Sequence, residues 1–576
     1  MRYGMAWVPL MERFRELCPW RRWPAQVACV YHPARHTESG YFMQRLLSVF
    51  IWVVIGSSVF HEQRVDAMTI GAGQESQLTN ALHNGINVFE LTGQITLSKP
   101  LVIVTNVVMQ GVNSNLAILS GNYKHRLFVI LPGGSLTLSN LTLINGRQTS
   151  TNSENGGIVQ AAGGAVYNDR GTLRIDRCVI SSHAVVGATG AAGLGGSGPN
   201  PGQIGGNALG GAIYNYQGAV VLNASTVMAN TVFAGAGGSG ADGSEVGLGQ
   251  NGANGGGSGL GAGGAIYSWG GSLEIVNCIV ASNSVSGAPG GKQGAGGGLL
   301  GFSAQPGAVN AAAGGGVYGE GNMNLSITAS QFIGNTVTNA PGWTGAVVKS
   351  EKPGAAGSTG GSSFGGAIYS NARLTLAGTT FWDNWVGGGL GGGGSPAGSS
   401  LFSLTGGDGG SGGTAIGGAV FSGEAGVAMA QNCYFTNNTA LGGPGGAGGA
   451  GNNPRAKNGR SGTSGLGAGS ALANPAGTFT LGNLNSGDVM ISTNVYGTFK
   501  NLPSQGFNYS LDGGSLTLRA STVFVGAEVQ VTTNLNAANT QWTTLAGRVV
   551  LVNTSAVYNV LLPSTTNVTH IYRLKY

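Results

Sequence analysis

The residues best suited to chemistry form one charged cluster, which contains Asp169, Arg170, Arg174, Asp176 and Arg177. Asp169 and Asp176 fall on different predicted strands of one repeat, where they could face each other as a general acid and a general base. With Arg177 beside them, they are the candidates for a catalytic site. The alternative, which we favour, is a solvated outer face on which every second residue of a strand points to water.

No other pattern in the sequence indicates a metal or cofactor site. Glycine-rich calcium repeats need a regularly spaced Asp, but Asp242 and Asp408 stand alone in their segments. No Gly-rich phosphate-binding motif precedes a predicted helix. The histidines that follow residue 67 are too dispersed for a metal site; they are His83, His125, His183 and His570. We therefore expect neither a cofactor nor a metal.

Composition excludes several classes of protein. Gly accounts for 109 of the 576 residues, charged residues for only 8%, and the formal net charge is +6. Lys and Arg do not cluster, so nucleic-acid binding is not expected. Hydrophobic residues still make up 41% of the chain, which is too many for a disordered polar linker.

A repeated unit accounts for most of the chain. The units GGAVYN, GGAIYN, GGAIYS, GGGVYG, GGAIYS and GGAVFS begin at residues 163, 210, 263, 314, 365 and 417. Their aromatic residues are 47 to 53 residues apart, and a weaker copy begins at Gly469. One such unit cannot bury its own apolar face, so successive units must stack on each other.

The segment after each aromatic residue predicts short strands with one side inward. In the third copy, Leu273 and Ile275 alternate with polar residues, and Cys278 and Val280 continue the inward side. Polar residues then recur at one position and predict a stacked side-chain ladder; they are His183, Asn230, Asn283, Asn335, Asn384 and Asn437. The recurring aromatic residues could stack on sugars, but one per unit favours a structural ladder.

Gly-rich segments separate the units, for example residues 187–206 and 442–454. The interpretation that we favour makes them flexible loops, so that Tyr214 stacks directly on Tyr267 and substitutions within 442–454 are nearly silent. In one alternative they pack together as extended polyglycine-like rods held by weak Cα–H···O contacts. In another, each segment forms a layer of its own and separates the aromatic residues.

Cysteine usage argues against a disulfide framework. Cys178, Cys278 and Cys433 follow the aromatic residue of their unit by 11 or 12 residues, where other units have Ser225 and Ala329. Their units stack at different levels, too far apart for a bond. We therefore predict small buried thiols.

The N-terminal region indicates export. Residues 46–60 are apolar, follow Arg45 and are too short for a comfortable membrane span. A candidate cleavage site follows Ala67, and Met43 is the expected start of translation. Residues 1–67 are thus predicted to be an N-terminal extension with a signal peptide, and no stable transmembrane span is expected in the mature chain.

The stretch from Asn87 to Ile130, followed by GGSLTLSNLTLING, resembles the N-terminal coils of pectin-lyase-like β-helix proteins. The GGAIY units are similar to those of polymorphic outer membrane proteins and autotransporter passengers. This resemblance implies an all-β, right-handed parallel β-helix over residues 68–485, with a short helix near Ser76–Leu82 covering its first turn. A linker at 486–510 and a C-terminal β-sandwich module at 511–576, with Trp542 in its core, would complete the chain.

Function is less constrained than fold. We expect a secreted or cell-surface protein without catalytic activity that contacts surface glycans or matrix through adhesion. The alternative is a polysaccharide lyase or glycoside hydrolase of the β-helix type, which would need clustered carboxylates, or acidic calcium ligands with a Lys or Arg base, on one external face. Between residues 205 and 485 there are only eight acidic and seven basic residues. The sequence sets neither the ligand nor the oligomeric state.

Overall fold

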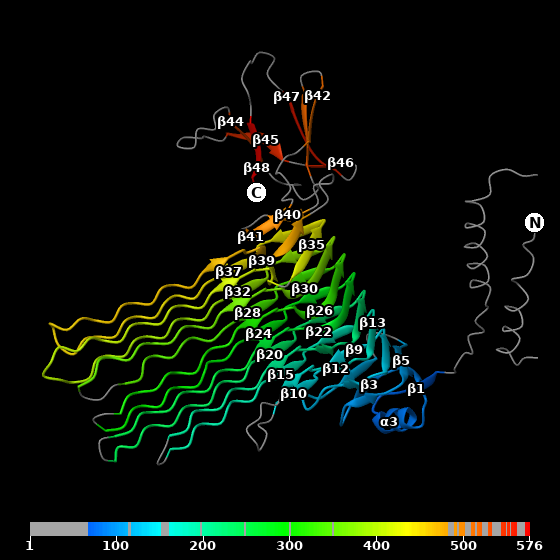
Figure 1. The fold of residues 1–576 in the computed structure, drawn as a ribbon. Coiled ribbons are helices and arrows are strands. Elements are labelled where there is room, and N and C mark those ends of the chain that lie inside the picture. The colour runs from blue at the N-terminus through cyan, green and yellow to red at the C-terminus, as the bar shows by residue number, and fades with distance from the viewer. Residues whose placement is uncertain are drawn as a thin grey trace, which may run out of the picture. The chain divides into compact units, whose positions relative to one another are not determined.

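The computed structural model describes residues 67–481 apart from 113–116, 151–159, 196–198, 247–248, 299–300, 348–350 and 425, and then the strands between Val489 and Lys575. These residues form an all-β structure in which four sheets are parallel and two further sheets are antiparallel (Figure 1). The expected signal peptide and Trp542 lie outside the described residues.

Each repeated unit visits the four parallel sheets in the same order, whereas the N-terminal turns before β10 visit only two of them. In the third unit these visits are β21 (Gly261–Ala262), β22 (Ile266–Val276), β23 (Ile279–Ala281) and β24 (Ser284–Ser286). A Gly-rich insert then leads to β25 (Ala312–Ala313), which pairs with β21. Every strand of the unit thus lies beside its counterpart from the next unit. Tyr214 pairs with Tyr267 and Tyr318 with Tyr369, so the predicted direct stacking is confirmed.

We name the parallel sheets main, second, third and fourth, in the order in which the chain visits them from the aromatic residue of each unit onward. The fourth sheet comprises β21 and β25 with β11 (Ala161–Ala162), β16 (Ala208–Leu209), β29 (Ser363–Phe364), β33 (Ala415–Ile416) and β38 (Gly467–Ala468). The main sheet comprises β22 with β1 (Met68–Ile70), β2 (Val88–Leu91), β4 (Leu101–Ile103), β5 (Asn106–Gly111), β7 (Phe128–Ile130), β8 (Ser135–Ser139), β12 (Val166–Asp169), β13 (Thr172–Asp176), β17 (Ile213–Tyr216), β18 (Ala219–Asn223), β26 (Val317–Thr328), β30 (Ile368–Ala377), β34 (Val420–Ser422), β35 (Val427–Gln431), β39 (Leu472–Leu481) and β41 (Val495–Lys500). The second sheet comprises β23 with β3 (Gln94–Thr96), β6 (Ile118–Ser120), β9 (Thr142–Ile144), β14 (Val179–Ser181), β19 (Thr226–Met228), β27 (Gln331–Ile333), β31 (Thr380–Trp382), β36 (Cys433–Thr436) and β40 (Val489–Ile491). The third sheet comprises β24 with β10 (Arg147–Thr149), β15 (Ala184–Val186), β20 (Thr231–Phe233), β28 (Thr336–Thr338), β32 (Trp385–Gly387) and β37 (Thr439–Leu441).

The apolar core lies between the main and second sheets. The four predicted inward residues of the third unit are all buried there; they are Leu273, Ile275, Cys278 and Val280. The helix α3 (Glu75–His83) buries Leu78 and Ala81 against the same core, as expected of a cover for the first turn. Near the N-terminus, Leu127, Phe128 and Ile130 are buried in the same core.

The GG pair of each unit makes the turn from the fourth sheet into the main sheet. Its first glycine has a positive φ, for example +66° at Gly263, which a side chain would strain. The aromatic residues that follow form one continuous ladder from Tyr167 to Phe421, with ring centroids 4.5–5.3 Å apart. Tyr267 is only 6% exposed and packs with Ala262 in an apolar cluster. The structural interpretation of this ladder is therefore confirmed for the buried rings.

The predicted amide ladder is present, with one correction. The backbone N–H and the side-chain amide of Asn230 both donate to Asn283 Oδ1, at 3.1 and 2.9 Å, and the pattern repeats up the coil. Its last member is Asn438, not Asn437. Asn437 has a φ of 53° and makes the left-handed turn that precedes the ladder residue, as Ser282 does before Asn283.

A second row of small polar side chains lies at the entrance to the second sheet. Each donates to the carbonyl two residues earlier; the members are Cys178, Ser225, Cys278, Ser330, Thr379 and Cys433. The three cysteines are buried and free, as predicted. Ala329 was expected in this row but has a φ of 47° in the turn before it. Ser330 takes the place because β26 holds an extra residue before this point.

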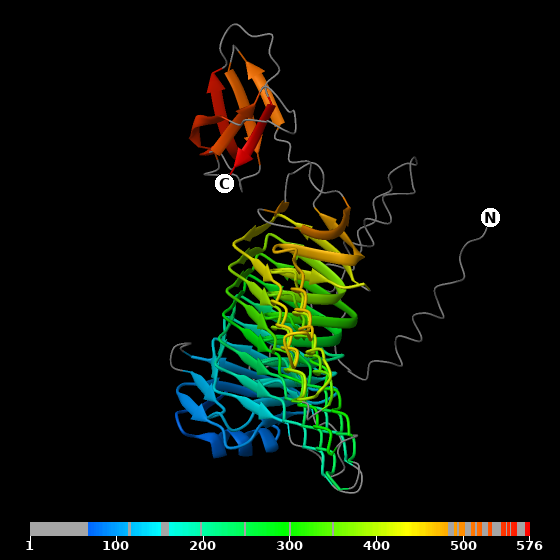
Figure 2. The same ribbon diagram turned by 90° about the vertical axis from the view of Figure 1, so that its left-hand side faces the viewer.

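The Gly-rich inserts are not flexible loops, and this part of our favoured interpretation was wrong. Each insert runs outward between the third and fourth sheets and returns, and the six inserts lie side by side as extended, wavy segments (Figures 1 and 2). The outgoing segments are 187–195, 234–246, 287–298, 339–347, 388–398 and 442–451, and the returning segments are 199–207, 249–260, 301–311, 351–362, 404–414 and 457–466. We call this assembly the glycine array.

Hydrogen bonds in the glycine array recur every third residue. The N–H groups of Gly237, Gly240 and Gly243 donate to carbonyls of the next outgoing segment, at 2.8–3.0 Å. Gly235 and Gly238 donate instead to the preceding returning segment, at 2.9 and 2.8 Å. Three residues per turn without internal hydrogen bonds is the geometry of a polyproline II helix. The alternative of packed polyglycine-like rods is therefore correct in its packing, but backbone N–H···O hydrogen bonds, and not only the expected weak Cα–H···O contacts, join the rods.

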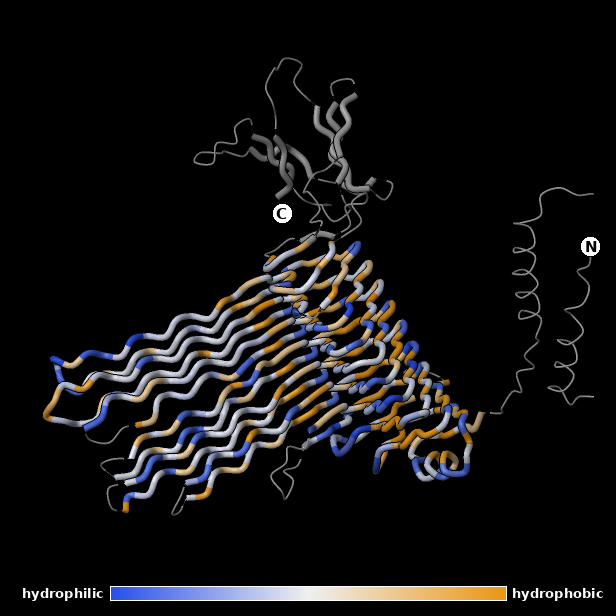
Figure 3. The backbone as a smooth tube through the Cα atoms, in the orientation of Figure 1, coloured by the Kyte–Doolittle hydropathy of each residue, from blue (hydrophilic) through white to orange (hydrophobic). Residues whose placement is uncertain are grey.

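Close approach, rather than unusual torsion angles, explains the glycines of the array. A Cβ atom at Gly256 would lie 1.9 Å from the carbonyl oxygen of Gln203, and one at Gly291 would lie 1.8 Å from that of Gly238. The third residue of each turn faces outward instead, where Ala, Pro, Ser and Thr are common. Figure 3 accordingly shows the array in pale colours, between the hydrophilic and hydrophobic extremes.

Beyond Leu481 the coil continues further than expected. β41 pairs with β39 and β40 with β36, and Phe499 packs on Phe479 with ring centroids 5.3 Å apart. Within the expected linker at 486–510, β40 and β41 thus add a partial turn over the last complete unit. Two antiparallel sheets follow, one of β42 (Asn508–Asp512), β43 (Ser515–Ala520), β47 (Ser555–Leu561) and β46 (Val550–Val552), the other of β45 (Thr543–Arg548), β44 (Glu528–Thr532) and β48 (Ile571–Lys575).

Candidate functional site

The two carboxylates singled out from the sequence do not face each other. Asp169 ends β12 and Asp176 ends β13, so the five-residue strand β13 separates them by roughly 13 Å at 3.3 Å per residue. Each pairs with the arginine that follows it: Arg170 Nε lies 2.8 Å from Asp169 Oδ1, and Arg177 Nη1 lies 2.6 Å from Asp176 Oδ2.

Asp176 and Arg177 also form hydrogen bonds with residues of neighbouring turns. Asp176 Oδ1 accepts a hydrogen bond from Asn223 Nδ2 at 2.6 Å, and Arg177 Nε donates to Asn140 Oδ1 at 3.0 Å. Both contacts join neighbouring turns along the outer side of the main sheet. Asp169 with Arg170 and Asp176 with Arg177 thus form two separate ion pairs on an outer face, an arrangement that resembles the solvated face more than an acid–base pair.

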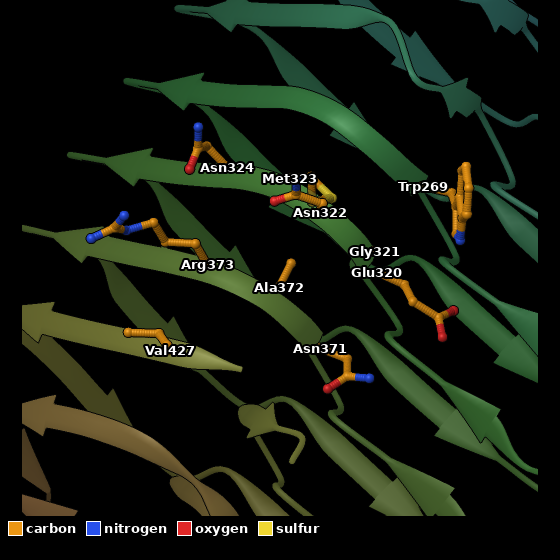
Figure 4. Close-up of a pocket in the computed structure, with 10 residues that line it drawn as sticks. All are labelled: Trp269, Glu320, Gly321, Asn322, Met323, Asn324, Asn371, Ala372, Arg373 and Val427. Atoms are coloured by element: carbon orange, nitrogen blue, oxygen red, sulfur yellow. The ribbon is translucent and has the colours of Figure 1, made fainter. Parts of the chain in front are cut away.

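A pocket of about 580 Å³ lies elsewhere on the main sheet, where β22, β26 and β30 meet (Figure 4). Its lining residues come from four successive units; they are Trp269, Glu320, Gly321, Asn322, Met323, Asn324, Asn371, Ala372, Arg373 and Val427. The pocket coincides with two register shifts, between Trp269 and Gly271 on β22 and between Glu320 and Asn324 on β26.

The register shifts follow from unequal segment lengths. Leu273, Leu325 and Leu374 pair with each other, but Tyr267 precedes its leucine by six residues, Tyr318 by seven and Tyr369 by five. The segment between the aromatic residue and the leucine is longer in the fourth unit than in the fifth. The two segments cannot pair along their whole length, and the pocket lies where this pairing is interrupted. Sequence reasoning missed this pocket, although these spacings were a signal that could have revealed it.

One wall of the pocket is aromatic. The Trp269 ring stacks on Tyr216 from the preceding unit, with centroids 5.0 Å apart and an interplanar angle of 7°, and both side chains are half-buried. On the other side of Trp269 in the same column lies Glu320, whose Oε2 accepts a hydrogen bond from Tyr318 Oη at 2.9 Å. Burial, with the neighbouring Tyr369 and Glu320, raises the pKa of Tyr318, so it remains a neutral donor.

Metal-binding geometry is not found in the part of the chain that the structure describes, where no three His, Cys, Asp or Glu side chains cluster suitably. His183 is instead the first member of the amide ladder: its backbone N–H donates to Asn230 Oδ1 at 3.0 Å. Its Nδ1 accepts from Gly146 N and its Nε2 lies 3.0 Å from Leu143 O, which fits a neutral ring. Burial lowers the pKa of His183 to about 3.

Among the described residues, none of the helices has the length and hydrophobicity needed to cross a membrane. Comparison with known proteins identifies no relative: no family model, no curated protein and no solved structure matches this chain.

Proposed function

We propose that this protein is an exported, non-catalytic β-helix protein of the cell surface or extracellular matrix, and that it works by adhesion. The coil would be a right-handed parallel β-helix of the pectin-lyase-like kind, as the sequence resemblance implies. Parallel pairing of every unit with the next, across four sheets, supports this proposal. The apolar segment at residues 46–60, read as part of a signal peptide, supports export.

The glycine array is the observation that carries the proposal. It places about half of each repeat outside the coil, in a hydrogen-bonded assembly whose outward residues are mostly small and uncharged. Such an assembly offers an ordered surface for contact and little that could activate a nucleophile or move a proton. A glycoside hydrolase, one form of the polysaccharide-cleaving alternative, would need two carboxylates about 5–9.5 Å apart. Asp169 and Asp176 are separated by more than this and are paired with arginines.

A binding screen tests the proposal. The purified full-length chain is applied to immobilised glycans and matrix polymers, and release of reducing or unsaturated sugar ends is assayed in parallel. We expect retention on at least one polymer without cleavage. Cleavage of any polysaccharide would favour the enzymatic alternative, and binding to none of them would contradict adhesion.

A further inference from the structure

We infer that the pocket beside Trp269 is a binding site for a neutral hexopyranose unit of a glycan. The inference rests on the proposed function, since it names the site and the class of ligand through which adhesion would occur. The observation behind it is a column of paired side chains on the outer side of the main sheet, in which the stack of aromatic rings stops at Trp269.

The column runs through paired positions of successive units: Asp169, Tyr216, Trp269, Glu320 and Asn371. Tyr216 and Trp269 stack, which leaves the second ring face of Trp269 directed at the level of Glu320. No ring is present at that level, and the Glu320 carboxylate is held by Tyr318 Oη. The stack of aromatic rings therefore ends at Trp269 and not at the end of the coil.

Glycine keeps the Trp269 ring accessible. Gly321 has a φ of +80°, and a Cβ atom there would lie 3.5 Å from Trp269 Cε2 and Nε1, in van der Waals contact with the indole. Trp269 and Asn371 are two turns apart, or about 9.6 Å at the usual strand spacing. A sugar ring stacked on the indole would lie against the Glu320 side chain, which Tyr318 Oη holds at the intervening level.

The volume and polarity of the pocket agree with this ligand. Ligand pockets typically enclose about 300–1,000 Å³, and this one measures about 580 Å³. Amide side chains, which both donate and accept, surround it at Asn322, Asn324 and Asn371, matching the dual character of sugar hydroxyls.

The charges in the pocket favour an uncharged ligand. Figure 4 shows Glu320 on the side of Trp269 and Arg373 at the opposite side. One negative and one positive side chain leave no net charge to select an acidic or basic sugar. Both can bond hydroxyl groups, Glu320 as an acceptor and Arg373 as a donor.

The test uses the full-length protein with three variants. Neutral gluco-, manno- and galacto-oligosaccharides serve as probes, with uronic-acid oligosaccharides for comparison, and affinity is measured by calorimetry. Trp269→Ala removes the stacking wall, and Arg373→Gln changes an exposed side chain whose loss should not affect folding. Trp382→Ala is the matched control, because Trp382 is 47% exposed on β31 of the second sheet.

We expect a neutral oligosaccharide to bind, with affinity reduced about tenfold or more by Trp269→Ala, measurably by Arg373→Gln and not by Trp382→Ala. If Trp269→Ala fails to fold, Arg373→Gln alone decides. Unchanged binding by the pocket variants, equal loss with Trp382→Ala, or binding of uronic-acid oligosaccharides alone would overturn the inference and leave adhesion standing. Absence of binding to any glycan or matrix polymer would overturn the proposed function as well.

Discussion

Replacing a single glycine of the array tests how the inserts pack. Gly446 lies in the outgoing segment of the last insert, and its φ is not in the left-handed region, so alanine suits its backbone. A Cβ atom there would nevertheless lie 2.0 Å from the carbonyl oxygen of Gly392 and 2.4 Å from the carbon. Relief needs a displacement of about 1 Å between two backbone segments, since such contacts stay beyond about 3 Å.

The cost of Gly446→Ala follows from what this displacement breaks. The N–H of Gly446 donates to the carbonyl oxygen of Gly410, and the carbonyl oxygen of Gly446 accepts from the N–H of Gly462, each at 2.8 Å. Overpacking costs about 1–3 kcal/mol and each lost hydrogen bond about 1 kcal/mol, offset by up to about 1 kcal/mol from the stiffer unfolded chain. We expect a net destabilisation of the array near this insert of about 3 kcal/mol.

Amide hydrogen exchange is the suitable assay, because the array can open locally while the coil stays folded. Peptides covering 442–466 should exchange roughly 100-fold faster in Gly446→Ala, while coil peptides of 427–441 should change little. Ala447→Ser, at the exposed next position, is the control and should match the original protein. Equal protection in both variants would refute the packed array and restore the flexible loops, for which changes within 442–454 are silent.

Three further changes probe the coil. Ile275→Asp should cost several kcal/mol and lower the melting temperature sharply, because Ile275 is fully buried, whereas Glu274→Gln on the exposed side should not. The lowered pKa of His183 predicts that stability is fully present above about pH 6.5 and is lost as pH falls toward 3, by up to about 1.4 kcal/mol per pH unit. The unfolded chain binds the proton that the folded chain excludes; His183→Asn should flatten this part of the pH–stability curve, and an unchanged curve would contradict the assignment. Finally, Cys178 and Cys433 should resist thiol reagents until the protein unfolds, since burial raises the pKa of both thiols to about 11; peptide mapping of the labelled protein checks this, and rapid labelling would contradict their burial.

The sequence alone determined the coil. A unit such as GGAIYSWGGSLEIVNCIVASNS carries its own strand pattern, because alternation at Leu273 and Ile275 specifies which side is buried. Recurrence of the unit then requires stacking, since only a neighbouring turn can cover the backbone hydrogen-bonding groups and the inward side chains. The free cysteines and the aromatic ladder follow from the same periodicity.

The tertiary structure decided what depends on more than one unit at a time. A Gly-rich segment has similar local preferences in a flexible loop and in an extended rod. Only the presence of five other inserts at the right spacing turns the N–H groups of residues such as Gly237 and Gly240 into regular donors. The pocket beside Trp269 likewise arises from a mismatch between the fourth and fifth units, which no single unit reveals. Local pattern fixed the inward and outward sides of each turn, whereas contacts between turns fixed the surface, because those contacts depend on the relative lengths of neighbouring units.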